Sequence, residues 1–213
     1  MKPLLLCLAL AVLPALGQQP GALIAPIALY TNFQQPPSGE VLLALQGEVE
    51  SVMSAAGLRF EWRALAGVQG NEVSVELAVV TFQGHCNADG LSSHSTHAGP
   101  LGWTHVSDGT ILPFSDVDCD GIRKFVSNGL LSVQPADRAA VYGRAVGRVL
   151  AHELYHIFAD TKHHGSCGVA KEAYTVQDLL SADFQFNEHE SNALRSGKAH
   201  TVLENAVAGD SSR

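Results

Sequence analysis

A cluster of side chains able to bind a metal ion lies in residues 151–165, AHELYHIFADTKHHG. His152 and His156 are four residues apart, so on a helix their imidazole rings lie on one face, one turn apart. This spacing suits two nitrogen ligands of one tetrahedral Zn²⁺ ion, each at about 2.0–2.1 Å. We therefore expect His152 and His156 to be metal ligands and Zn²⁺ to be the cofactor. The alternative is a helix end with solvated histidines, which the helix dipole favours mildly.

Glu153 follows His152 directly and projects about 100° around the helix from it. Its carboxylate can then reach a water molecule at the metal without binding the metal itself. In that position Glu153 acts as the general base, which takes a proton from the attacking water and passes it to the leaving amine. A purely structural metal site has no need of this residue, so its presence favours a hydrolytic enzyme.

A tetrahedral site needs a third protein ligand, and here the sequence resembles the metzincin zinc peptidases. Their motif is H-E-x-x-H-x-x-G-x-x-H, in which the glycine ends the helix and the chain turns back to present the third histidine. Those two positions hold Ala159 and Lys162 in this chain. A shift by one residue puts Asp160, which tolerates a left-handed conformation, at the turn. The resemblance then implies His163 as the third ligand, with His164 as the second choice.

Metzincins also have a methionine turn beneath the metal, but this chain has no methionine after Met53. The segment CGVAKEAY, residues 167–174, occupies the place of that turn in the order of the chain. We expect Val169 or Ala170 to form its apolar floor. The resemblance implies two possible roles for Tyr174: it stabilises the oxyanion, as a tyrosine does in some metzincins, or it serves in packing.

A different zinc geometry stays open, in which a glutamate on a later helix is the third ligand, as in thermolysin-like peptidases. The candidates downstream of the histidine cluster are Glu172, Glu188 and Glu190. The last two also have the acidic character of an ordinary helix start.

The elements around the cluster alternate between strand and helix patterns. Residues 58–65 alternate apolar and charged side chains, as a half-buried strand does. Asp108-Gly109 between two short apolar runs predicts a hairpin. Residues 135–160 form a long helix that carries the cluster, with Pro135 near its first turn. The other expected elements are strands at 22–33 and 71–84, a helix through 41–53, and short helices at 118–131, 175–180 and 187–195.

This order predicts an α/β fold, with a mixed twisted sheet packed on two long helices. The resemblance implies the metzincin catalytic domain, and the order agrees with that family over residues 22–163. In metzincins an edge strand binds the substrate backbone, and residues 101–114 would supply that strand and its neighbour. Gly143 and Gly147 would let the long helix approach the sheet closely, at a cost in helix propensity.

The amino-terminal sequence, MKPLLLCLALAVLPALG, has one lysine, an apolar run and then small residues. We interpret residues 1–17 as a signal peptide, 18–196 as the metallopeptidase domain and 197–213 as a flexible tail. This predicts a secreted or periplasmic protein without a stable membrane anchor. A net charge of −8 argues against nucleic acid as a partner. The sequence does not indicate the oligomeric state.

Three cysteines follow the expected signal peptide, and export permits a disulfide. Because three is an odd number, at most one bridge forms within the chain. Cys86 and Cys119 both follow predicted strands, so we expect them to meet at one end of the sheet. Cys167 is then free or pairs between chains.

Together these features predict a secreted zinc-dependent endopeptidase with protein or peptide substrates. The expected ligands are His152, His156 and His163, and Glu153 is the expected general base. The alternative is an exported zinc-binding protein without catalytic activity, whose metal would be structural.

Overall fold

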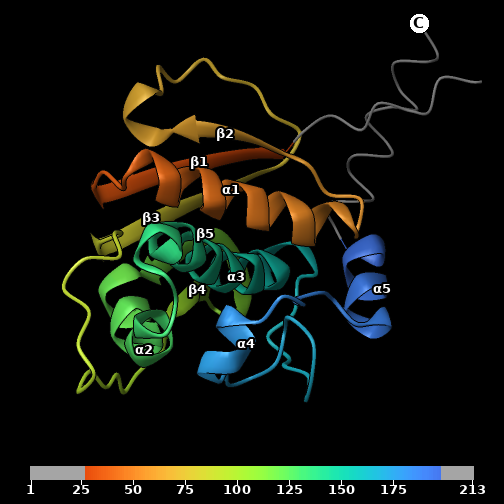
Figure 1. Ribbon diagram of the computed structural model, residues 1–213. Coiled ribbons are helices and arrows are strands. Elements are labelled where there is room, and N and C mark those ends of the chain that lie inside the picture. Colours follow the sequence, from red (N-terminus) through yellow and green to blue (C-terminus); the bar gives the residue numbers. More distant parts are fainter. Residues whose placement is uncertain (1–26, 198–213) are drawn as a thin grey trace, which may run out of the picture.

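A twisted five-stranded sheet with helices packed against one face forms the part of the chain that the computed structural model describes, residues 27–197 (Figure 1). The strand order is β2-β1-β3-β5-β4. The first four strands in this order run parallel, and β4 runs antiparallel to β5 at the edge. The strands are β1 (Ile27–Gln35), β2 (Phe60–Ala64), β3 (Leu77–His85), β4 (Gly102–Ser107) and β5 (Thr110–Asp118). The predicted mixed α/β fold is thus confirmed.

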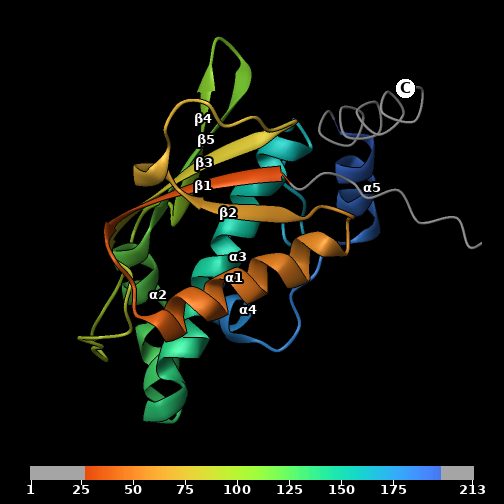
Figure 2. The ribbon, with the colours of Figure 1, turned by 90° about the horizontal axis from the view of Figure 1, so that it is seen from above.

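The helices lie between and after the strands in the predicted order. The two long helices, α1 and α3, cross beneath the sheet, and Figure 2 shows them from above. The helices are α1 (Gly39–Ser54), α2 (Cys119–Leu131), α3 (Arg138–Phe158), α4 (Val176–Leu180) and α5 (Glu188–Ser196), with single 3₁₀ turns at Leu65–Gly67 and Pro135–Asp137.

The core lies between the sheet and its helices, and the residue patterns account for it. In β3, every second residue is buried: Ala78, Val80 and Phe82. In α1, the buried residues recur at helical spacing, for example at Val41 and Leu45. Burial of alternate strand residues and of one helix face removes the apolar surface of both layers from water, which is the main favourable term in folding.

Two glycines of α3 bring it close to α1 rather than to the sheet. A Cβ atom added to Gly143 would lie 2.5 Å from the backbone oxygen of Val41, and one added to Gly147 would lie 2.8 Å from that of Leu45. The expectation that these glycines face the sheet is therefore wrong, because α1 occupies the space beside them. Close packing of the two helices fixes α3, which carries the histidine cluster.

One strand boundary also differs from the prediction. β3 begins at Leu77 instead of residue 71, and Val73 is 89% exposed. The carboxylate of Glu72 accepts hydrogen bonds from the backbone N–H groups of Gln69 and Gly70, at 2.7 and 2.9 Å. These bonds close a local turn at residues 69–72, although the side chains that follow alternate as in a strand.

The predicted hairpin and the predicted disulfide are confirmed. Asp108 and Gly109 both have positive φ, 49° and 84°, as a tight hairpin turn between β4 and β5 requires. Cys86 and Cys119 follow the adjacent strands β3 and β5 and form a disulfide with a Cα–Cα distance of 4.9 Å. Cys167 is free and exposed.

The proposed signal peptide, residues 1–17, lies outside the described residues, as does the tail after Gly197. Among residues 27–197, no helix has the length and apolar character needed to cross a membrane.

Candidate metal centre

The histidine cluster lies at the carboxyl end of α3 and in the turn that follows. α3 ends at Phe158, and Asp160 has a positive φ of 48°. The N–H of Thr161 donates to the carbonyl of His156 at 3.2 Å, the reversal that commonly closes a helix after a left-handed residue. Asp160 therefore makes the predicted turn, which sends the chain back toward the helix face that carries His152.

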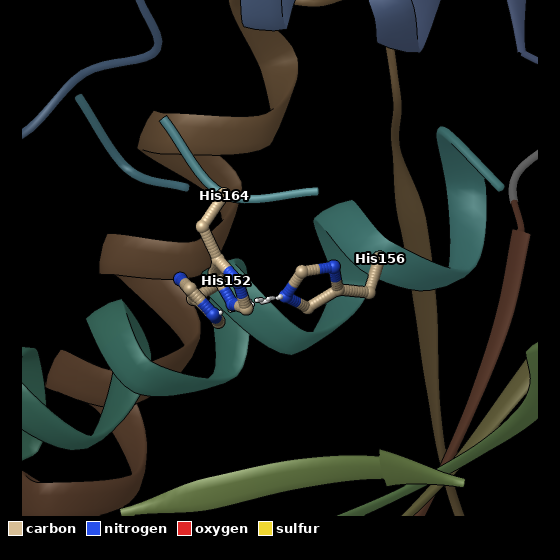
Figure 3. A group of neighbouring side chains, drawn as sticks. All are labelled: His152, His156 and His164. Carbon is tan, nitrogen blue, oxygen red and sulfur yellow. Dashed lines mark hydrogen bonds between the residues drawn. The ribbon is translucent and has the colours of Figure 1, made fainter. Parts of the chain in front are cut away.

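Three histidines converge after this turn. The Nε2 atom of His156 lies 3.0 Å from Nε2 of His152 and 3.1 Å from Nε2 of His164. Figure 3 shows the three rings, two from α3 and one from the following loop, pointing toward one another. One ligand atom from each of the three lies within 4.8 Å of the others. They form the candidate metal centre of the described residues.

The expected third histidine, His163, lies outside this group, and His164, the second choice, lies within it. The backbone N–H of His163 donates to the Oγ1 atom of Thr161 at 3.1 Å, and the His163 side chain is exposed. That small turn presents the next residue, His164, to the other two histidines. The spacing from Asp160 to the third histidine is thus four residues, one longer than in the metzincin motif.

Hydrogen bonds on the far side of two rings fix which nitrogen faces the centre. Nδ1 of His152 lies 2.9 Å from the carbonyl oxygen of Val169, and Nδ1 of His156 lies 2.7 Å from that of Thr161. A carbonyl only accepts, so each Nδ1 carries the proton and donates it. Each Nε2 then presents a lone pair to the centre, as a metal-binding imidazole does.

The environment of His152 keeps this ring neutral. Burial, together with the nearby His156, lowers the pKa of His152 to about 4. When His152 and His156 are neutral and each donates its Nδ1 proton to a carbonyl, neither Nε2 atom carries a proton. The two facing lone pairs then repel one another. A cation between them removes that repulsion. For Zn–N bonds of about 2.0–2.1 Å in a tetrahedron, neighbouring nitrogens are roughly 3.3 Å apart, close to the observed separations.

Glu153 lies buried beside the histidines, with 5% of its surface exposed. Its Oε2 atom accepts a hydrogen bond from Oγ1 of Thr104 in β4 at 2.8 Å. The Thr104 hydroxyl in turn lies 2.9 Å from Oγ of Ser115 in β5, which can donate to it. Burial raises the pKa of Glu153 to about 7, although the hydrogen bond from Thr104 opposes this rise. A carboxyl group with this pKa can accept and release a proton near neutral pH.

A cavity of about 540 Å³ connects these groups with the edge of the sheet. The three histidines and Glu153 line one part of it. β4 lines another part through Gly102, Trp103, Thr104 and Val106. Among the described strands, β4 pairs only with β5, so its other edge has unpaired backbone groups. The tip of its hairpin with β5 projects beyond the rest of the sheet (Figure 2).

The loop expected beneath the metal lies behind His152. Val169 and Ala170 are both buried, as expected for an apolar floor. The loop closes on itself, because the N–H of Gly165 donates to the carbonyl of Ala170 at 2.8 Å. The hydroxyl of Tyr174 donates to the carbonyl of Val169 and lies 3.0 Å from Nδ1 of His152. In this position it contacts the Nδ1 side of the ring, away from the facing Nε2 atoms.

None of the three candidate glutamates belongs to the histidine group of the described residues. Glu172 lines the cavity, and Glu188 lies exposed in the first turn of α5. Glu190 is buried, but its carboxylate accepts hydrogen bonds from the backbone N–H groups of Val169 and Ala170. It supports the loop behind His152 instead of taking part in the group.

Sequence reasoning missed the polar partners of the site. Thr104 in β4 contacts Glu153, and two carbonyls of the loop after α3, those of Thr161 and Val169, contact the histidines. Glu190 in α5 supports this loop. Of these residues, only Glu190 was considered from the sequence, as an acidic residue downstream of the cluster and a possible metal ligand.

Comparisons with known protein families, curated proteins and solved structures found no match to this chain.

Proposed function

We propose that this protein is a secreted zinc-dependent endopeptidase that works in the manner of the metzincins. One observation carries the proposal: three histidine Nε2 atoms converge beside a buried glutamate in a cavity that runs along a sheet edge. The proposed zinc ligands are therefore His152, His156 and His164, with Glu153 as the general base.

The donor set supports zinc and a catalytic site. Imidazole nitrogens are common ligands of Zn²⁺, and catalytic zinc sites have three protein ligands with the fourth position left for water or substrate. The group formed by the described residues has three members, whereas a structural site is closed by four. When bound, zinc would polarise the scissile carbonyl and lower the pKa of the attacking water.

Glu153 has the surroundings of a general base. Its carboxylate lies in the same cavity as the histidines, and Thr104 holds it in one orientation. In the proposed reaction, Glu153 takes a proton from water as the oxygen attacks the peptide carbonyl. It then gives this proton to the leaving nitrogen, so that the carboxylate is regenerated.

The edge strand supports a peptide as the substrate. An extended peptide can pair with the free edge of β4 through backbone hydrogen bonds, as in other strand-addition complexes. The cavity lies along β4, so a peptide bound there would pass the histidine group. The Cys86–Cys119 disulfide fits an oxidising compartment, in agreement with secretion.

Hydrolysis of casein by the purified full chain tests this proposal. We expect activity that a chelator abolishes and that added Zn²⁺ restores. Glu153→Gln should retain zinc and lose roughly 10²- to 10⁴-fold in rate, because it removes the general base. Bound zinc without hydrolysis in the wild type would instead indicate the non-catalytic zinc-binding protein.

A further inference from the structure

Glu190 is a buried acid that the proposed reaction does not use. Only 2% of its surface is exposed, and it lies in α5, more than thirty residues after the histidines of α3. Its carboxylate accepts three backbone hydrogen bonds: from Val169 at 3.1 Å, from Ala170 at 2.9 Å and from Asn187 at 2.9 Å. The Asn187 bond belongs to the cap of α5. The other two reach across to the loop behind His152.

The contact between Glu190 and this loop is close. Gly168 has a φ of 83°, and a Cβ atom added there would lie 2.3 Å from Oε2 of Glu190. Glycine adopts this backbone conformation without the steric cost that other residues incur. The loop therefore approaches the carboxylate at a distance that a side chain at residue 168 would prevent.

One peptide group connects Glu190 to the metal centre. The N–H of Ala170 and the carbonyl of Val169 belong to the same planar peptide unit. Its N–H donates to Oε1 of Glu190, and its carbonyl faces Nδ1 of His152 at 2.9 Å. The orientation of this unit is thus held at both ends. A carboxylate at the N–H also polarises the peptide, which strengthens its carbonyl as an acceptor.

We propose that Glu190 is a positioning residue of the metal centre, which acts on His152 through the Val169–Ala170 peptide. It orients the carbonyl that fixes the ring and the tautomer of His152, so that Nε2 faces the centre. This inference rests on the proposed zinc site. Helix α5 would thus support the proposed ligand His152 although it contributes no ligand itself.

Zinc affinity of the full chain, measured by competition with a chelator, tests the inference. Glu190→Gln keeps the size of the side chain but turns an amide N–H₂ toward backbone N–H groups, so at least one hydrogen bond is lost. We expect its zinc affinity to fall by about ten- to a hundredfold, the usual effect of removing a group that orients a metal ligand. The absorption spectrum of the Co²⁺-substituted protein should change as well.

Two variants of the same helix serve as controls. Leu194→Ala removes a buried apolar side chain from α5 and should lower the melting temperature without a change in zinc affinity or in the Co²⁺ spectrum. Glu188→Gln neutralises an exposed acid of the same helix and should change neither property. If Glu190→Gln does not fold, Glu190→Asp, whose shorter carboxylate cannot keep the same contacts, takes its place in the comparison.

The outcomes separate this inference from the proposed function. A Glu190 variant with the zinc affinity of the wild type would overturn the inference alone. The same holds if Leu194→Ala, at an equal decrease of the melting temperature, loses as much zinc affinity as the Glu190 variant. Absence of zinc from the wild type would overturn both. Loss of affinity in the Glu190 variant of a protein that binds zinc but hydrolyses nothing would support the inference and contradict the proposed function.

Discussion

At the scale of single residues, Thr104 orients the carboxylate of Glu153. The Thr104 hydroxyl donates a hydrogen bond of 2.8 Å to this buried group. Thr104→Val has nearly the same shape but no donor. We expect it to lower kcat/KM by about tenfold to a hundredfold, since hydrogen bonds to charged groups contribute roughly 1.5–3 kcal/mol. Thr104→Ser retains the hydroxyl and should keep most of the activity. Equal rates for the valine variant and the wild type would contradict this role.

The neutral state of His152 predicts how the metal-free protein responds to acid. The unfolded chain binds a proton at this residue near its ordinary pKa of 6.5, but burial lowers the folded-state pKa to about 4. Between these values the unfolded state binds more protons, so the stability from His152 is present above pH 6.5 and is lost as the pH falls toward 4. The loss should be on the order of 2–3 kcal/mol.

Thermal unfolding of the metal-free protein between pH 7 and pH 4 measures this loss. His152→Asn should show a smaller decrease of the melting temperature over the same range. His163→Asn, in which an exposed ring outside the histidine group is replaced, should behave like the wild type. A wild-type melting temperature that does not change over this range would contradict the prediction.

At the scale of elements, the contact between α1 and α3 sets the position of the helix that carries His152 and His156. Gly143→Ala should destabilise the protein by about 1–2 kcal/mol, because overpacking commonly costs more than the gain in helix propensity. The added methyl group would meet the backbone oxygen of Val41 at 2.5 Å. Gly47→Ala in α1 has no atom within 4 Å of the new Cβ and should stabilise the protein by up to about 1 kcal/mol. Denaturant unfolding compares the two; a stabilised Gly143→Ala would refute the packing argument.

The elements themselves could be predicted from the sequence where local patterns decide them. Helical spacing indicated α1 and α3, and the Asp108-Gly109 turn indicated the hairpin of β4 and β5. The start of β3 could not be predicted this way. The Glu72 side chain accepts hydrogen bonds from the backbone of Gln69 and Gly70, and an alternating pattern does not reveal this turn.

The candidate site was predictable to the extent that it depends on one helix. His152, Glu153 and His156 follow from their spacing on α3, and Asp160 follows from its tolerance of a positive φ. Motif spacing alone could not decide between His163 and His164. In the structure, the His163 N–H donates to the side chain of Thr161, a local turn that the spacing does not reveal. Glu190 and Thr104 depend on tertiary contacts between distant segments.

At the scale of the whole molecule, all parts of the proposed site converge on one end of α3. The edge strand β4 contributes Thr104, and the turn after α3 contributes His164. Helix α5 supports the loop behind His152. The proposed function therefore depends on a single claim, that His152, His156 and His164 together hold a zinc ion.

Zinc content per chain, measured on the purified wild type and on two single variants, tests this claim most directly. We predict one zinc per chain in the wild type, loss of the metal in His164→Ala and retention of the metal in His163→Ala. Retention in His164→Ala together with loss in His163→Ala would contradict the claim, and so would a wild-type protein that binds no zinc.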